Sequence, residues 1–487
     1  MGLGIQEKRV VSPGSPAKTA PESAAVARAE GAPDCAPTTP VDQAIFDVQV
    51  GNARGVTLNG VYKYPSNEVL EADKKAITKR REELALAVRP YEPSITLDTS
   101  SQGFNWKTAV AGGEMSELAY ADEKTVRSQL GTWGFDDVLW VDKKTPLHSV
   151  KDIFRARDVQ AFVGASKDAI AVSFRGTERN SLRDILTDMA ALFPSDMKAK
   201  AFPVGMTPAA KASFDEKLLG AMGKRLGQDF VDQAKRMDTR LTPEQITKIV
   251  AALPDATAEA LGDASGAKVI EDAIHRGFKQ SKDMVAPELL TKILTLWEDD
   301  IINKKALRPV FLFGHSMGGA EATLFGYDLL ATTEQMGSLA RAAGLKNMAD
   351  LVKPGFKLPF GGVYTYEAPH SFKRKAADEI VKLDLGFQPE DLIHNFARMG
   401  DPVPNLPTFG SYTNLGNTIY LNGTLGRLAN CPDPRATALV NPSGAELKAL
   451  KAKRAHEWLD TTAPSDINAH LLGEIRDLVK AQAALAQ

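Results

Sequence analysis

One short segment, Gly314-His315-Ser316-Met317-Gly318-Gly319, constrains the fold of this chain more than any other. The apolar run at 308–313 before it predicts a buried strand, and the residues at 320–330 after it are good helix formers. Gly314 and Gly318 suit a sharp turn, because side chains at these two positions would crowd the backbone. The segment therefore predicts a strand, a tight turn at Ser316 and a helix.

The remaining pattern indicates an α/β fold. Compact apolar runs at 168–174 and 362–366 resemble the run before Ser316, and helix-length amphipathic stretches separate such runs along the chain. Alternation of this kind is typical of a mostly parallel sheet flanked by helices. No internal repeat of fixed period is visible, so solenoids and propellers are excluded.

Composition divides the chain into two parts. Residues 1–42 are rich in Ala, Pro, Ser and Glu and predict a disordered tail, because they offer too little apolar surface to offset the entropy of ordering. Residues 43–487 are expected to form one domain. Within it, Lys, Ala, Leu, Met and Asp at helical spacing predict a helical insertion over 197–268, either a solvated hairpin or a mobile cover.

Charge and apolar runs exclude several classes of partner. The 59 basic and 61 acidic side chains give a net charge of -2, which favours neither nucleic acid nor an anionic membrane. No transmembrane segment or cleavable secretory signal is predicted. The two cysteines, Cys35 and Cys431, imply no disulfide framework. We expect a soluble protein, either cytoplasmic or exported without a cleavable signal.

The predicted turn at Ser316 suits a nucleophile. A serine hydroxyl becomes reactive when a base removes its proton and donors stabilise the resulting oxyanion. At the start of a helix, the backbone N–H of Met317 can serve as one donor and the helix dipole favours negative charge. The glycine spacing fits neither a P-loop nor a dinucleotide-binding fingerprint.

Several segments, in this order along the chain, resemble the class 3 lipases, a family that includes fungal triacylglycerol lipases and plant phospholipases A1. Gly-His-Ser-Met-Gly-Gly-Ala at 314–320 resembles the G-H-S-L-G-G-A of the family. The other similar segments are Phe-Arg-Gly-Thr at 174–177, Leu-Thr-Asp at 186–188, His-Arg-Gly-Phe at 275–278, Tyr-Thr-Tyr-Glu-Ala-Pro at 364–369 and Asp-Pro-Val-Pro at 401–404.

The resemblance implies an α/β-hydrolase-like fold and a Ser-Asp-His triad in that chain order. By position, Ser316 is the nucleophile and Asp401 the carboxylate that orients the histidine. Two histidines follow Asp401. His470 resembles the family's terminal stretch and is the preferred base, whereas His456 lies in a lysine-rich helical pattern and is the alternative.

The same resemblance assigns the oxyanion hole to Thr177 and Met317. It implies structural roles for Arg175, His275, His315 and Asp188. Glu367 departs from the family, which commonly has glycine there, and this affects the shape of the pocket. Residues 178–196 fall where family members carry a lid, although an ordinary buried helix is an equal interpretation.

The sequence therefore predicts a serine carboxylic-ester hydrolase of lipase type that acts on acylglycerol or phospholipid esters through an acyl-enzyme. We expect transient contact with a lipid interface and no cofactor or metal, because no zinc or calcium ligand spacing is present. The alternative is a catalytically silent hydrolase-fold scaffold that binds a protein partner through the helical insertion.

Overall fold

The computed structural model describes much of the chain between residues 90 and 485. The described residues are 57–58, 61–62, 90–100, 103–144, 158–176, 197–201, 216–217, 220–221, 223–227, 268–333, 336–342, 344–353, 355–382, 386–398, 401, 403–406, 412–422, 437–440, 470 and 472–485. The predicted tail at 1–42 and the predicted lid at 178–196 lie outside them.

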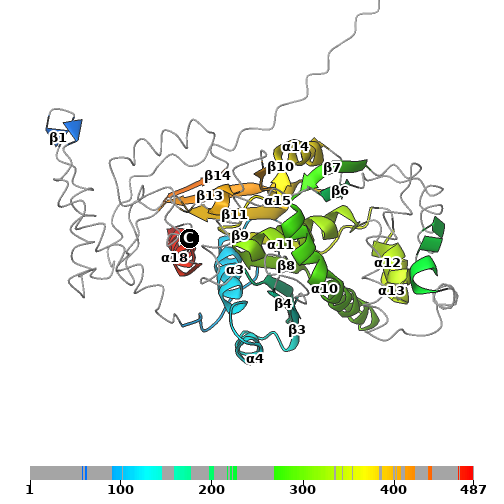
Figure 1. Ribbon diagram of the computed structural model, residues 1–487. Helices are drawn as coiled ribbons and strands as arrows, with labels where there is room; N and C mark the ends of the chain where they lie inside the picture. Colours follow the sequence, from blue (N-terminus) through cyan, green and yellow to red (C-terminus); the bar gives the residue numbers. More distant parts are fainter. Residues whose placement is uncertain are drawn as a thin grey trace, which may run out of the picture.

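An eight-stranded sheet forms the centre of the molecule (Figure 1). Its strands are β3 (Asp137–Lys144), β4 (Asp158–Ala165), β5 (Ile170–Phe174), β8 (Val310–His315), β9 (Phe360–Tyr366), β11 (Ile393–Arg398), β13 (Asn417–Asn422) and β14 (Thr437–Val440). Their order is β14-β13-β11-β9-β8-β5-β4-β3. The pairs from β13 through β5 are parallel, and the three outer pairs are antiparallel. The mostly parallel centre fits an α/β-hydrolase fold.

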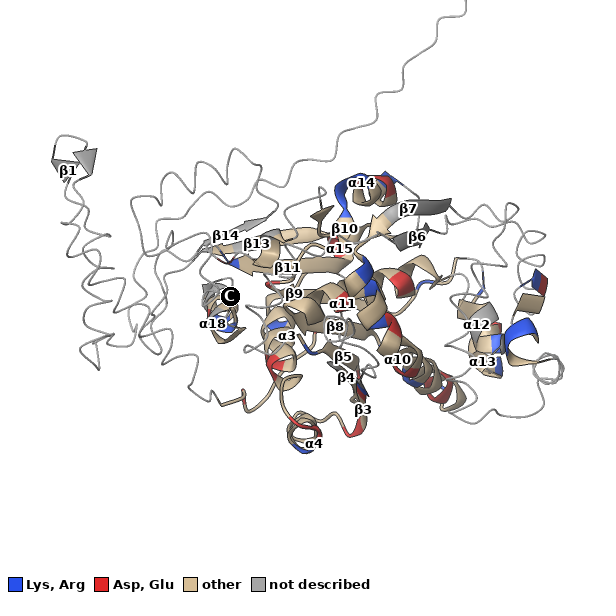
Figure 2. Ribbon diagram, viewed as in Figure 1, with Lys and Arg blue, Asp and Glu red and all other residues tan. Residues whose placement is uncertain are grey.

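Helices cover both faces of this sheet. The described helices are α3 (Trp106–Leu118), α4 (Glu123–Thr132), α10 (Arg276–Ile302), α11 (Met317–Ala331), α12 (Met336–Ala342), α13 (Lys346–Leu351), α14 (Arg374–Lys382), α15 (Pro389–Leu392) and α18 (Leu472–Leu485), with a 3-10 turn at Val403–Asn405. Charged residues of both signs lie along outer helices such as α10 and α14 (Figure 2). Among the described helices, none has the length and apolarity to cross a bilayer.

Strand β8 contributes to two hydrophobic cores because successive side chains of a strand point to opposite faces. Val310 and Leu312 belong to the core that contains α10 and α11. Phe311 and Phe313 belong to the core that contains α3 and α18. All residues of β5, β8 and β9 are buried, as expected for strands covered on both faces.

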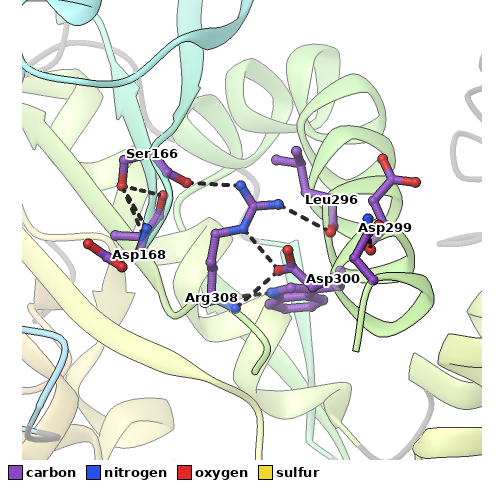
Figure 3. Close-up of polar contacts among 9 residues, drawn as sticks. Ser166, Asp168, Leu296, Asp299, Asp300 and Arg308 are labelled. Carbon is purple, nitrogen blue, oxygen red and sulfur yellow. Dashed lines mark hydrogen bonds and ion pairs between the residues drawn. The ribbon is translucent and has the colours of Figure 1, made fainter. Parts of the chain in front are cut away.

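The amino end of β8 is anchored by Arg308 (Figure 3). The Arg308 Nε donates to Asp300 Oδ2 at 2.9 Å, and Nη1 donates to the carbonyl of Ser166 at 3.0 Å. The indole of Trp297 donates to the Arg308 carbonyl at 2.8 Å. These bonds join the end of α10, the loop before β5 and the start of β8. The strand that leads to Ser316 is therefore held at the end opposite the site.

The predicted helical insertion over 197–268 was wrong at its start. Residues Met197–Ala201 form strand β6, which pairs antiparallel with β7 (Lys268–Ile274). These strands continue through β10 (Phe372–Lys373) to β12 (Tyr412–Thr413) in a second, four-stranded sheet. Helical residues are described within the insertion only at 216–217, 220–221 and 223–226. A separate hairpin joins β1 (Thr57–Leu58) and β2 (Val61–Tyr62).

Candidate active site

Ser316 occupies the predicted turn between strand and helix. It lies between the end of β8 and the start of α11, with φ 57° and ψ -131°. A positive φ is costly for a residue with a Cβ and is maintained only when the surroundings impose it. The Ser316 N–H donates to the Tyr366 carbonyl at 2.9 Å, so the neighbouring strand β9 helps to hold the turn. Ser316 itself is buried.

The glycines around Ser316 allow the backbone to approach itself closely. A Cβ at Gly314 would lie 2.7 Å from the Gly319 nitrogen and would overlap the Gly318 carbonyl. A Cβ at Gly318 would overlap the Phe174 carbonyl at the end of β5. The glycine spacing read from the sequence therefore has a steric cause on both sides of the serine.

Asp401 and His470 are hydrogen-bonded to each other. The His470 Nδ1 lies 2.7 Å from Asp401 Oδ2, although the two residues are 69 positions apart. The second oxygen of Asp401 accepts from the Val403 N–H at 2.8 Å, which orients the carboxylate. Both side chains are buried, and a charge-assisted hydrogen bond is strong in such a setting. The structure thus joins two of the three residues that the sequence predicts as a triad.

His470 also lies beside the turn that carries Ser316. Its ring stacks on the ring of His315, with centroids 4.6 Å apart and an interplanar angle of 28°. Among the described residues, the His470 Nε2 has no hydrogen-bond partner. When Asp401 holds the proton on Nδ1, the lone pair on Nε2 is available to accept another proton. The imidazole is thus available as a base beside His315, the residue that precedes Ser316.

The strand order explains how these groups meet. Ser316 follows β8 and Asp401 comes shortly after β11, while β9 lies between these two strands. The three strands are parallel, so their carboxyl ends lie at one edge of the sheet. Binding sites of open α/β sheets form at this edge.

The loop after β5 also contacts the turn. A Cβ on Gly176 would overlap the His315 carbonyl and lie 3.1 Å from the Ser316 Cβ. Met317 is the first residue of α11. Thr177 follows Gly176 directly but lies outside the described residues, as does the alternative base His456. The structure therefore locates one predicted oxyanion residue and the neighbour of the other.

Three residues that contact His470 or its neighbours had no predicted part in the chemistry. Glu367, directly after β9, has an Oε2 3.5 Å from His470 Nδ1 and 3.4 Å from His315 Nε2. Arg398 Nε lies 3.6 Å from Glu367 Oε1, and the Tyr120 hydroxyl lies 2.9 Å from His315 Nδ1. In the sequence, Glu367 could have been noticed as an acidic residue at the end of an apolar strand, at a position where class 3 lipases commonly have glycine.

His315, Glu367 and His470 are the described side chains that could hold a metal ion, with ligand atoms within 4.8 Å of one another. Their geometry does not favour such a site. The two imidazoles are stacked, so their in-plane lone pairs do not converge on one point. In addition, Asp401 already contacts His470 Nδ1, and the Arg398 guanidinium lies beside Glu367.

Two other histidines, the buried His394 and the partly buried His370, are poor candidates for the base. Burial lowers the pKa of His394 and of His370 to about 4, and the nearby Arg374 also lowers that of His370. His394 lies within β11 against the rings of Phe104 and Tyr364. Such groups remain neutral and weakly basic, and they pack within the structure.

No protein-family model matches the sequence, and no curated protein is significantly similar to it. Three similar solved structures are a Rhizomucor miehei lipase in complex with its propeptide, the Lip2 lipase of Yarrowia lipolytica and lipase II of Rhizopus niveus. Their sequence identities are 15%, 16% and 14%, and their TM-scores 0.36, 0.37 and 0.34. The alignments cover 80%, 72% and 70% of this chain and 84%, 88% and 88% of theirs.

These three identities are below 25% and the TM-scores below 0.5. The function of this chain therefore has to be inferred from its own site.

Proposed function

We propose that this protein is a serine carboxylic-ester hydrolase of lipase type. The observation that carries the proposal is the buried Asp401–His470 pair, which lies beside the strained turn that presents Ser316. Each residue type has the chemical property that acyl transfer requires: a hydroxyl nucleophile, an imidazole base and a carboxylate that orients the base. Their convergence from distant parts of the chain supports a catalytic role over a purely structural one.

In the proposed reaction, His470 Nε2 removes the proton from Ser316 Oγ as this oxygen attacks the ester carbonyl carbon. The imidazolium is stabilised by Asp401, and it protonates the leaving alcohol when the ester C–O bond breaks. The resulting acyl-serine is then attacked by water, whose proton passes to His470. Return of that proton to Ser316 Oγ releases the carboxylic acid and regenerates the enzyme.

The tetrahedral intermediates carry a negative oxygen that needs donors. We assign this role to the backbone N–H of Met317, at the start of α11, and to Thr177, the residue that follows Gly176 in the sequence. Two features support the assignment. Gly176 packs closely against Ser316, and the dipole of the 15-residue helix α11 favours negative charge at its first turn.

Acylglycerol or phospholipid esters are the proposed substrates. The motifs shared with class 3 lipases support this choice, as does the predicted lid at 178–196, which would make transient contact with a lipid interface.

The test is hydrolysis of p-nitrophenyl esters of graded acyl length and of a fluorogenic phospholipid. We expect turnover by the wild type with preference for long chains, and a loss of about 10⁴-fold or more in Ser316→Ala. Ser128→Ala, on the exposed face of α4, is the matched control and should keep full activity. A folded wild type that hydrolyses no ester faster than Ser316→Ala would overturn the proposal in favour of a binding scaffold.

A further inference from the structure

We infer that Glu367 is a second carboxylate for the base, a positioning residue that stabilises the His470 imidazolium together with Asp401. The inference rests on the proposed function, because it assigns a role at the same site. It starts from two distances to one atom: His470 Nδ1 lies 2.7 Å from Asp401 Oδ2 and 3.5 Å from Glu367 Oε2. His470 Nδ1 is therefore hydrogen-bonded to Asp401 and lies within ion-pair distance of a second carboxyl group.

The backbone places Glu367 at this point. Its N–H donates to the Phe396 carbonyl at 2.7 Å, so it is bonded to β11, the strand that precedes Asp401. The residue before it, Tyr366, accepts from the Ser316 N–H. Glu367 thus lies at the carboxyl edge of the sheet between the nucleophile and the acid. The side chain of Glu367 therefore starts close to the triad, and its carboxyl group reaches His470.

Two unfavourable features indicate that this carboxylate has a function. Glu367 has a φ of 53°, a conformation that glycine would adopt without strain. Its carboxylate is also fully buried, and a buried carboxylate requires compensating positive charge or hydrogen bonds. Strain and buried charge at one residue are characteristic of functional sites.

The charges around His470 make the role specific. Asp401 and Glu367 supply carboxyl groups, and the guanidinium of Arg398 has its Nε 3.6 Å from Glu367 Oε1. His315 stacks on His470 and is tied to the Tyr120 hydroxyl. With Asp401, Glu367 and Arg398 charged and both histidines neutral, these groups sum to one negative charge. Protonation of His470 during acyl transfer brings the sum to zero, so Glu367 favours the charged state of the base.

A structural alternative is that Glu367 serves only to neutralise Arg398. The two roles differ in one measurable respect, the acidic limb of the pH profile of kcat/KM, which reports protonation of the base in the free enzyme. If Glu367 stabilises the imidazolium, its removal lowers the plateau rate and moves the acidic limb to lower pH. A purely structural defect lowers the plateau and leaves the limb in place.

The experiment compares wild type with Glu367→Gln, which has the same shape and no charge. We expect the acidic limb to shift downward by about half a pH unit or more, with a roughly tenfold lower plateau. Glu367→Asp is tolerated at positive φ and keeps a carboxyl group at this position, but its side chain is one methylene shorter and withdraws that group from His470. This variant should also shift the acidic limb of the kcat/KM profile to lower pH. If Glu367→Gln does not fold, Glu367→Asp alone tests whether Glu367 stabilises the imidazolium.

A second readout does not depend on the choice of ester. The rate at which a fluorophosphonate labels Ser316 is measured against pH in each variant, and it should show the same shift of the acidic limb. The loss of labelling rate caused by Asp401→Ala should be about tenfold larger in the Glu367→Gln background than with Glu367 present, because two carboxylates that stabilise the same imidazolium act non-additively. An unmoved limb and additive losses would overturn the inference. Failure of wild type both to react with the probe and to hydrolyse esters would instead overturn the proposed function.

Discussion

At the scale of single residues, this protein concentrates strain where the chemistry is proposed. Of the three described non-glycine residues with positive φ, Ser316 and Glu367 belong to the candidate site and Lys304 does not. The turn at Ser316 exists because Gly314 and Gly318 let β8, α11 and β5 approach within distances that no Cβ allows. Packing of the surrounding strands maintains the strained serine.

Gly318→Ala tests this steric constraint. The new methyl would overlap the Phe174 carbonyl and lie 2.8 Å from the Arg175 carbonyl carbon, so the turn and the end of β5 must separate. We expect the free energy of unfolding to fall by roughly 2–3 kcal/mol and kcat/KM by about 10²-fold or more, because the nucleophile is displaced. Both effects are measured by chemical denaturation and ester hydrolysis.

Gly131→Ala in α4 is the matched control, since a Cβ there meets no atom within 4 Å. It should leave activity unchanged and raise stability by up to about 1 kcal/mol through helix propensity. A Gly318→Ala protein as stable and active as wild type would mean that the close approach is not required.

At the scale of elements, helix α18 determines where the base lies. His470 comes just before α18, and α18 packs on α3 in the core that also contains Phe311 and Phe313. Arg476 ties the two helices together: its Nη2 donates to Glu114 Oε1 at 2.6 Å, and both side chains are buried. Lys480 adds a second contact to Glu114 at 3.0 Å.

We predict that Arg476→Met lowers the free energy of unfolding by roughly 2–3 kcal/mol, because the buried Glu114 loses its Arg476 partner and keeps, among the described contacts, Lys480 and the Glu92 N–H. Ester hydrolysis should fall as well, since a loosened α18 no longer holds His470 against Asp401. Thermal denaturation and activity of the same preparation provide the measurement. Arg127→Met, whose ion pair with Glu123 is about half exposed, is the control and should cost less than about 1 kcal/mol. Equal effects in the two variants would contradict the assignment.

At the scale of the whole molecule, the stability of the fold depends on pH through two histidines that are shielded from water and stay uncharged. Burial lowers the pKa of His394 and His370 to about 4, below the ordinary value of 6.5. Between these values the unfolded chain binds protons that the folded protein does not. The free energy of unfolding therefore rises with pH in this window, and the contribution of these two histidines is fully present above about pH 6.5.

We predict that the folded state loses roughly 2–3 kcal/mol per histidine as the pH falls from about 6.5 to 4. Replacing the imidazole in His394→Phe should remove one of the two contributions while keeping ring contact with Phe104 and Tyr364. The measurement is the midpoint of urea unfolding at several pH values. Identical pH slopes in wild type and variant between pH 4 and 6.5 would show that His394 is not a source of the dependence.

Two features of the sheets could not be predicted from the local sequence pattern. The short, lysine-rich stretch at 197–201 indicated part of a helical insertion, yet it forms a strand because β7 offers it a partner about 70 residues away. The parallel sheet was expected from buried apolar runs, and its antiparallel edges depend on which strands become neighbours. Strand pairing is a long-range property that residue periodicity does not specify.

The sequence by itself determined the turn at Ser316, because backbone sterics at Gly314 and Gly318 act within a few residues. It also predicted the buried strands that surround this turn. The pairing of Asp401 with His470 was expected from the resemblance to class 3 lipases, whereas the contact itself and the approach of Glu367 to the same nitrogen come from the tertiary structure. Those contacts follow from the order β8-β9-β11 and from the packing of α18 on α3, which bring together groups far apart along the chain.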